Sequence, residues 1–180
     1  MDSSRHAKPQ GHSLFELLAA VAIAGIMLAI AVPRMTAFVD HTKAKASVSD
    51  IHQAFRLARQ SAVEQQQYGF ICPLDANNEC HNDWNLPISV FVSPSRKGEL
   101  TTDSQLLREF RASNHLTVAT VPSTRRYFRY NSRGQLPGFM GHVRFCPTEQ
   151  STDAARLIIS LGGRTRVEWE SKSGNSGGCA

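Results

Sequence analysis

The sequence predicts an α+β fold in which a long N-terminal α-helix packs on a small antiparallel β domain. Two observations predict it. An almost uncharged apolar run near the N-terminus continues into a stretch of helical periodicity, and short strand-like segments follow, separated by turn-forming residues. The chain has 180 residues, of which 41% are hydrophobic and 19% are charged. That length allows one domain with a core and an appendage, and the composition excludes a disordered or collagen-like protein.

The apolar run, Leu14–Val32, contains a single charged residue, Glu16. As a helix it spans roughly 28 Å, about the thickness of the hydrocarbon core of a bilayer. Arg5 and Lys8 precede it, so we expect the first 11 residues to stay on the cytoplasmic side. A cleaved secretory signal is disfavoured because the run is long and no small-residue cleavage site follows it. An ordinary signal anchor stays open as an alternative.

Glu16 lies in the first turn of this helix, where burial of a carboxylate in lipid is costly. Such a carboxylate needs a partner, and a free amine on a neighbouring subunit is a natural one. The alternative is a side chain that reaches the cytoplasmic interface and needs no partner. The first possibility predicts that the helix assembles with other copies of itself.

The residues around the start of the run resemble the class III leader junction of type IV pilins and type II secretion pseudopilins: Lys8-Pro9-Gln10-Gly11-His12-Ser13-Leu14-Phe15-Glu16. The resemblance implies that a prepilin peptidase removes residues 1–11 by cutting between Gly11 and His12, and then methylates His12. Glu16 becomes the fifth residue of the mature chain, where it can neutralise the amine of the next subunit. Pro33 matches the family's helix-kinking proline, whereas His12 stands where the family usually has Phe. Residues 12–33 are then the transmembrane and filament-core helix.

Beyond Pro33 the pattern is amphipathic and predicts a helical stalk over residues 34–68 that ends near Gln67. We expect Pro33 to bend the helix. One face is apolar and repeats at steps of three and four residues: Val48, Ile51, Phe55, Ala58 and Ala62. The polar residues that lie mostly off this face are expected to be solvated: Lys45, Ser49, His52, Arg56 and Arg59.

Residues 69–180 are predicted to form a β-rich head. The expected strands are Gly69–Cys72, Pro87–Val92, Leu106–Arg111, Leu116–Val121, Tyr127–Asn131, His142–Cys146, Arg156–Leu161 and Thr165–Trp169. The pair Gly162-Gly163 predicts a tight two-residue turn between the last two strands. Aromatic residues alternate with Arg in Tyr127–Tyr130 but lack the glycines of an RNA-binding strand, so we expect them to pack in the core.

The four cysteines allow three pairings, and we favour Cys72–Cys80 with Cys146–Cys179. The first pair closes a short loop, and the second ties down a Gly/Ser-rich tail. A zinc site formed by Cys72, Cys80 and His81 is the alternative, although its spacing matches no common zinc pattern. Disulfides imply an oxidising compartment such as the periplasm. No metal and no other cofactor is expected.

Positive charge is concentrated in the second half of the chain. After residue 95 there are 13 basic and 7 acidic residues, and 11 of the basic ones are Arg. Arg binds phosphate in a bidentate manner, so an Arg-rich face suggests an anionic partner such as nucleic acid. The candidate residues are Arg133, Arg144, Arg156, Arg164 and Arg166.

Among these candidate arginines, the two in the final hairpin give the most specific prediction. If Arg164 and Arg166 share one strand, they point to the same face about 6.6 Å apart and can reach neighbouring phosphates. Glu168 and Glu170 follow on that face. The alternative is therefore a solvated outer surface on which Arg pairs with Glu, and both interpretations stay open.

The head also resembles the GspH/FimT family of pilin-like proteins. The resemblance rests on Gly163-Arg164-Thr165-Arg166-Val167 after Ala155-Arg156-Leu157-Ile158-Ile159-Ser160, on Tyr130-Asn131-Ser132-Arg133-Gly134, and on Cys72…Cys80 followed by Trp84. It implies a type IV pilin-like lollipop fold. In FimT-type members the first of these segments is implicated in binding DNA during natural transformation. FimU-type members help to prime the pilus near its tip.

The two resemblances together imply a minor type IV pilin. Its partners would be other major and minor pilin subunits, the prepilin peptidase and the inner-membrane assembly platform, with double-stranded DNA as a further candidate. The chain would cross the inner membrane once with a periplasmic head, and would reach the cell surface in the pilus. A type II secretion pseudopilin that moves protein cargo is the alternative, but pseudopilins often lack a proline at the position of Pro33. No Walker, GxSxG or HExxH motif is present, so we expect no enzymatic activity.

Overall fold

The computed structural model describes residues 14–111, 116–148 and 153–170. The chain divides into two compact units, residues 1–39 and residues 40–180. One helix, α1 (Leu14–Glu64), contributes its first half to one unit and its second half to the other. We describe each unit by itself.

The first unit is the N-terminal half of α1. Its segment Leu14–Val32 has a mean hydropathy of 2.5, and none of it is buried within the protein. A helix of this length and composition can cross a membrane, and the exposure of so many aliphatic side chains is costly in water. The helix continues through Pro33 without interruption.

The second half of α1 carries the apolar face that the sequence predicts. Val48, Phe55, Ala58 and Ala62 are all buried. The helix ends at Glu64, three residues before the expected end. Gln66 follows with a φ of 54°, and a left-handed residue at this position stops helical hydrogen bonding.

Eight strands form two antiparallel four-stranded sheets, and each lies within two residues of its predicted position. The first sheet has the order β3-β2-β1-β5 and the second β4-β6-β7-β8. Their bounds are β1 (Tyr68–Pro73), β2 (Ile88–Ser93), β3 (Gln105–Phe110), β4 (Leu116–Val121), β5 (Phe128–Tyr130), β6 (Gly141–Pro147), β7 (Ala154–Ile159) and β8 (Thr165–Glu170). The predicted fold class, an N-terminal helix with antiparallel sheets, is confirmed.

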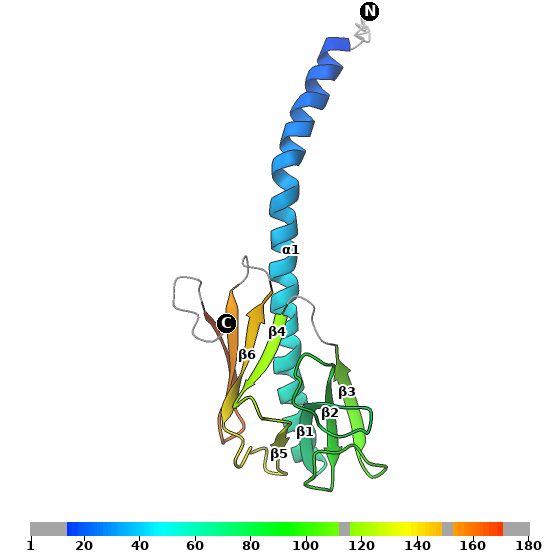
Figure 1. The fold of residues 1–180 in the computed structure, drawn as a ribbon, viewed down its shortest axis with the longest axis vertical. Coiled ribbons are helices and arrows are strands. Elements are labelled where there is room, and N and C mark those ends of the chain that lie inside the picture. The colour runs from blue at the N-terminus through cyan, green and yellow to red at the C-terminus, as the bar shows by residue number, and fades with distance from the viewer. Residues whose placement is uncertain (1–13, 112–115, 149–152, 171–180) are drawn as a thin grey trace, which may run out of the picture. The chain divides into compact units, whose positions relative to one another are not determined.

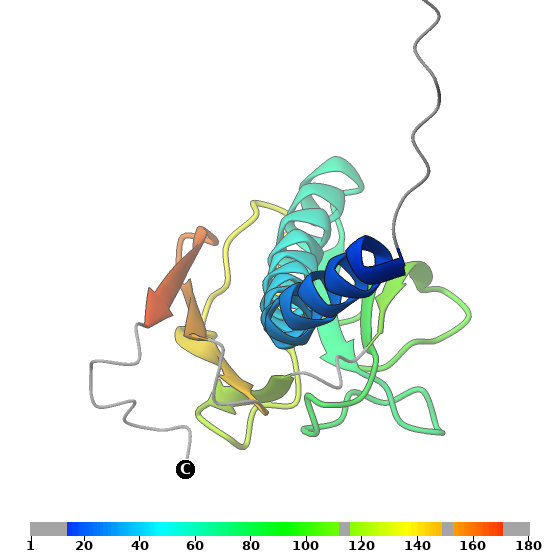
Figure 2. The same ribbon diagram turned by 90° about the horizontal axis from the view of Figure 1, so that it is seen from above.

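The two sheets lie on either side of the second half of α1 (Figures 1 and 2). One buried cluster joins this half of the helix to strands of both sheets, and its buried members run from Ala44 to Ile159. Phe128 of β5 packs edge-on against Phe55 of α1 and against Trp84, with ring centroids 5.1 and 5.4 Å apart. Phe128 and Tyr130 are fully buried, so the aromatic segment packs in the core as expected. The unit formed by residues 40–180 thus contains its own core.

The hairpin between β7 and β8 differs from the prediction. Ser160 pairs with Arg164, because the Ser160 amide donates to the Arg164 carbonyl at 3.0 Å. The loop therefore contains three residues, Leu161, Gly162 and Gly163, and not two. Its third residue, Gly163, has a φ of 81°, which is typical of a three-residue hairpin loop that ends on a left-handed glycine.

Candidate anion-binding site

Two loops that are far apart in the sequence pack together at one end of the head. The Leu136 amide donates to the Leu161 carbonyl at 3.0 Å, which joins the turn after β5 to the β7–β8 loop. A Cβ atom on Gly163 would lie only 1.9 Å from the Gly134 carbonyl oxygen. Glycine at position 163 is therefore required both by the close approach and by the backbone conformation.

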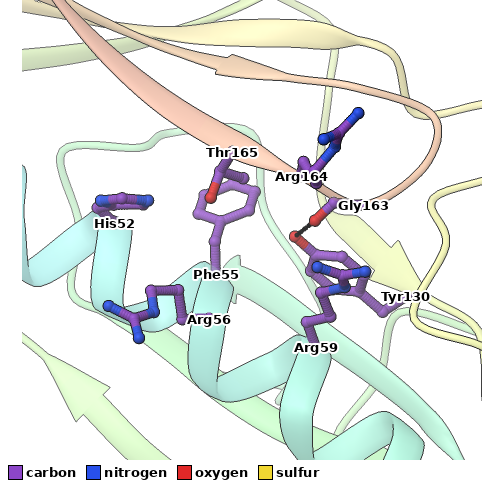
Figure 3. Close-up of a pocket in the computed structure, with 8 residues that line it drawn as sticks. All are labelled: His52, Phe55, Arg56, Arg59, Tyr130, Gly163, Arg164 and Thr165. Atoms are coloured by element: carbon purple, nitrogen blue, oxygen red, sulfur yellow. Dashed lines mark hydrogen bonds between the residues drawn. The ribbon is translucent and has the colours of Figure 1, made fainter.

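Two side chains fix these loops to the core. The buried Tyr130 hydroxyl donates to the Gly163 carbonyl at 3.3 Å, and Arg59 of α1 donates from Nε to the Gly134 carbonyl at 3.0 Å. Burial raises the pKa of Tyr130 far above its ordinary value, so the phenol stays neutral and remains a donor. Figure 3 shows the Tyr130–Gly163 hydrogen bond beside the Arg59 side chain. The loop that precedes Arg164 is thus held in one place relative to α1.

A hollow of about 320 Å³ lies between this loop and α1. Arg56 and Arg59 extend from the helix, whereas Arg164 stands at the rim with its side chain directed away from the helix (Figure 3). The lining contains three guanidinium groups and no carboxylate: His52, Phe55, Arg56, Arg59, Tyr130, Gly163, Arg164 and Thr165. Within the described part of the chain, none of the three arginines is in a salt bridge. The hollow is therefore suited to an anion.

Three of the five predicted arginines lie elsewhere, on the outer face of the second sheet. Arg144 is opposite Arg156 in the register, and Arg166 is opposite Ile158. Arg156 is paired with Glu170, and Arg166 with Glu168 at 2.8 Å. At these two positions the alternative interpretation holds, namely an outer surface on which Arg pairs with Glu.

The other two predicted arginines lie near the packed loops. Arg133 is exposed in the turn after β5, two residues beyond Asn131, whose carboxamide oxygen accepts from the Arg133 amide at 3.0 Å. Arg164 is the residue immediately before β8, which begins at Thr165 as expected. It pairs with Ser160 at the end of the β7–β8 loop and directly precedes the strand that contains Arg166.

The residues that α1 contributes to the hollow are not among the site residues predicted from the sequence. His52, Arg56 and Arg59 were expected to be solvated. Their spacing of four and three residues places them on one helix face, next to the buried stripe that contains Phe55. This spacing is the signal that could have found them, although it does not say what the face lies against.

His142 lies beside the arginines of the outer face. Its Nε2 is 3.5 Å from an Arg144 terminal nitrogen. Partial burial lowers the pKa of His142 below its ordinary value, and the positive charges of Arg144 and Arg156 lower it further, while Glu170 opposes them. The imidazole is therefore less readily protonated than a free histidine.

Cys72 and Cys80 are joined by a disulfide with their Cα atoms 5.5 Å apart, so neither thiol can bind zinc as the alternative required. The loop that they close is ordered by Asp75, whose Oδ1 accepts from the amides of Asn77 and Glu79, both at 2.9 Å. These hydrogen bonds, above all that from Glu79, lower the pKa of Asp75. Cys179, the expected partner of Cys146, lies outside the described residues.

Other predicted site residues belong to the N-terminal segment. Gly11 and His12 lie outside the described residues, so the cleavage site is not part of the structure. Glu16 is in the first turn of α1 and is exposed. Among the described residues, no group of three His, Cys, Asp or Glu side chains is placed to hold a metal ion.

Comparisons with known proteins agree with this architecture. The family model described as "Type II transport protein GspH" matches residues 47–163, well over half of the chain. Two crystal structures of the type IV minor pilin FimU from Pseudomonas aeruginosa share the fold. One is 20% identical with a TM-score of 0.56, and the alignment covers 79% of this chain and 99% of that one. The other is 21% identical with a TM-score of 0.54, and the alignment covers 76% and 99%.

No curated protein matches the chain. The family match, residues 47–163, covers strands β1 to β7 of the head and most of the helix half that packs against them. The chain belongs to the GspH family and has the fold of a type IV pilin.

Proposed function

We propose that the protein is a minor type IV pilin that takes part in pilus assembly near the tip. The observation that carries this proposal is the combination of a pilin-type head with the exposed apolar helix Leu14–Val32, which holds one acidic residue. The chain would be made as a prepilin, cut between Gly11 and His12 by prepilin peptidase and methylated on His12. It would then stay in the inner membrane with a periplasmic head until the assembly platform adds it to the filament. Its role is that of a structural subunit and not an enzyme.

Glu16 supports assembly by differential solvation. In a lone subunit its carboxylate lies at the start of a lipid-spanning helix and is poorly solvated. In a filament the methylated amine of His12 on the next subunit could neutralise it. Packing of the helices would then neutralise an unpaired charge and bury apolar surface. Pro33, at the end of the apolar run, favours a type IV pilin over a secretion pseudopilin.

The assembly role is tested in a strain that lacks the gene. Loss of surface pili, restored by the wild-type chain, is expected. Restoration should fail with Glu16→Ala and should be better with Glu16→Asp, which keeps the charge. Normal numbers of pili in the deletion strain would contradict an assembly role.

We propose DNA binding as a second function. Its candidate residues are Arg133, Arg144, Arg156, Arg164 and Arg166, and the observation that favours it is the carboxylate-free, arginine-lined hollow beside Arg164. Contacts of this kind bind the phosphate backbone, so affinity should be independent of sequence and should fall as salt rises. Two of the five arginines already have glutamate partners, so we expect Arg164 to contribute more than Arg156.

The DNA role is tested by mobility shift of double-stranded DNA of unrelated sequences. The wild-type chain should retard all of them, and Arg164→Gln combined with Arg166→Gln should weaken retardation. If the double variant binds as well as the wild type, the DNA role of this hairpin is wrong. Loss of transformation with pili intact in the deletion strain would point to a receptor, whereas loss of pili would point to priming.

A secretion pseudopilin that moves protein cargo remains the alternative, since the matching family model is named for type II transport. The two functions predict different phenotypes. A deletion that leaves pili and transformation intact but stops protein secretion would favour the pseudopilin.

A further inference from the structure

One wall of the hollow beside Arg164 is formed by α1, and its arginines are not among the candidate residues of the proposed DNA site. We propose that Arg56 and Arg59 of α1 act together with Arg164 as one binding site for the phosphodiester backbone of nucleic acid. This inference rests on the proposed DNA-binding function and deepens it, because it assigns part of the contact to the helix and not only to the β domain.

The helix places its two arginines side by side. Arg56 and Arg59 are three residues apart, so they lie on the same helix face, separated by about 4.5 Å along the axis. Both line the hollow, together with Arg164 from the opposite loop (Figure 3). Residues about a hundred positions apart in the sequence therefore line one concave surface, with Arg164 at its rim and its guanidinium directed away from the helix.

The loop backbone and the Arg59 side chain are held in place before any ligand binds. Arg59 uses its Nε to hold the Gly134 carbonyl, which leaves its terminal nitrogens for a ligand. The Gly163 backbone is held by Tyr130 and by its close contact with Gly134. Arg56 is exposed, and no hydrogen bond or ion pair holds it within the described part of the chain. Arg59, whose guanidinium is held by the Gly134 carbonyl, therefore loses less conformational entropy when it binds an anion.

This site differs from the outer face of the second sheet in its balance of acidic and basic side chains. None of the eight residues that line the hollow is acidic. On the outer face, a phosphate would have to displace Glu170 from Arg156 or Glu168 from Arg166. A phosphate in the hollow meets no such competition, so removal of a charge there should cost more affinity.

The row of cations favours a polyanion over a single carboxylate. A second hollow adjoins the first and is lined by Arg164, Thr165 and Arg166 among others. Cationic side chains therefore continue from α1 to Arg164 and on to Arg166 of β8, which is paired with Glu168. A backbone with a negative charge on every nucleotide can contact several of them at once, whereas one acidic side chain of a protein partner cannot.

The test measures binding of the full chain, in neutral detergent micelles, to a fluorescently labelled 30-base-pair DNA at several salt concentrations. Arg56→Gln is the main variant because Arg56 holds no loop in place. We expect about three- to tenfold weaker binding near 0.1 M salt, and a salt slope that is smaller by about 0.9 for each phosphate that the variant no longer neutralises. Arg56→Lys should restore most of the salt slope. Lys97→Gln is the matched control, since it removes one exposed positive charge beside the Cys72–Cys80 loop, and it should bind nearly as the wild type.

The outcomes distinguish the inference from the function on which it rests. Suppose that Arg164→Gln weakens DNA binding but Arg56→Gln and Arg59→Gln leave it unchanged. This result would overturn the helix contact and leave the DNA role intact. Equal losses for Arg56→Gln and Lys97→Gln would show a general charge effect and would also overturn it. A wild-type chain that binds no DNA would refute both the DNA role and the helix contact, while the assembly role would be unaffected.

Discussion

Replacement of Gly163 by Ala tests the contact between the two loops that hold Arg164. Gly163 has a φ of 81°, a conformation that costs an alanine roughly 1–2 kcal/mol. The new Cβ would also lie 1.9 Å from the Gly134 carbonyl oxygen, whereas real Cβ contacts essentially never fall below 3.0 Å. The loops must therefore move apart.

This separation has a further cost that can be worked out from the structure. It would break the hydrogen bonds from Tyr130 to Gly163 and from Leu136 to Leu161, each of which contributes about 1 kcal/mol. The total is about 3–4 kcal/mol. For a domain of this size the expected fall in Tm is roughly 10 °C, at about 3 °C per kcal/mol.

Two other glycines allow the cost of the backbone conformation to be measured apart from the cost of the close contact. Gly138 has a φ of 79° but no atom within 4 Å of its virtual Cβ, so Gly138→Ala should cost only the conformational part, about 1 kcal/mol. Gly162 has neither a positive φ nor a neighbour within 4 Å, and Gly162→Ala should cause no loss.

The assay is thermal unfolding of residues 40–180 followed by circular dichroism, since this unit contains its own core. The expected order of Tm is Gly162→Ala, then Gly138→Ala, then Gly163→Ala, from highest to lowest. If Gly163→Ala unfolds at the same temperature as Gly138→Ala, the close contact between the loops contributes nothing, and the reasoning is refuted.

Three further predictions concern other parts of the head. Replacing Cys72 and Cys80 together by Ala opens a short loop that the disulfide closes. The free energy of unfolding, measured by urea titration, should fall by about 2.5 kcal/mol, and an unchanged value would argue against the disulfide. Because the pKa of His142 is lowered in the folded state, the unfolded chain takes up a proton there first as pH falls. Stability should therefore be complete above about pH 6.5 and decline below it, and His142→Gln should remove part of that decline; an identical pH profile would contradict the assignment. Buried Trp84 donates from Nε1 to the Arg125 carbonyl at 2.8 Å, so Trp84→Phe should cost about 1–3 kcal/mol in the same urea titration, and no loss would show that the carbonyl finds another donor.

Much of the fold could be predicted because its signals are local. The buried face of α1 follows from apolar residues at steps of three and four, and it contains Val48 and Phe55 as expected. Strand β4 alternates strictly between buried and exposed residues from Leu116 to Val121, as its sequence suggests. Such patterns depend only on neighbours along the chain.

The candidate site could be predicted only in part, because it depends on contacts between distant segments. Gly162 and Gly163 are both compatible with a two-residue turn, and the sequence alone does not indicate that Gly163 packs against Gly134. A polar helix face that faces water looks the same in sequence as one that lines a hollow. For this reason Arg56 and Arg59 were assigned to solvent, although they lie across from Arg164.

The most direct test of the proposed function is the mass of the subunit in sheared, purified pili. If the chain is a processed minor pilin, the pili should contain a form that begins at His12, lacks the first 11 residues and carries one added methyl group. The same form should be absent from cells without prepilin peptidase. A chain that keeps Met1 in cells with active peptidase, or that is absent from the pili altogether, would contradict the proposal.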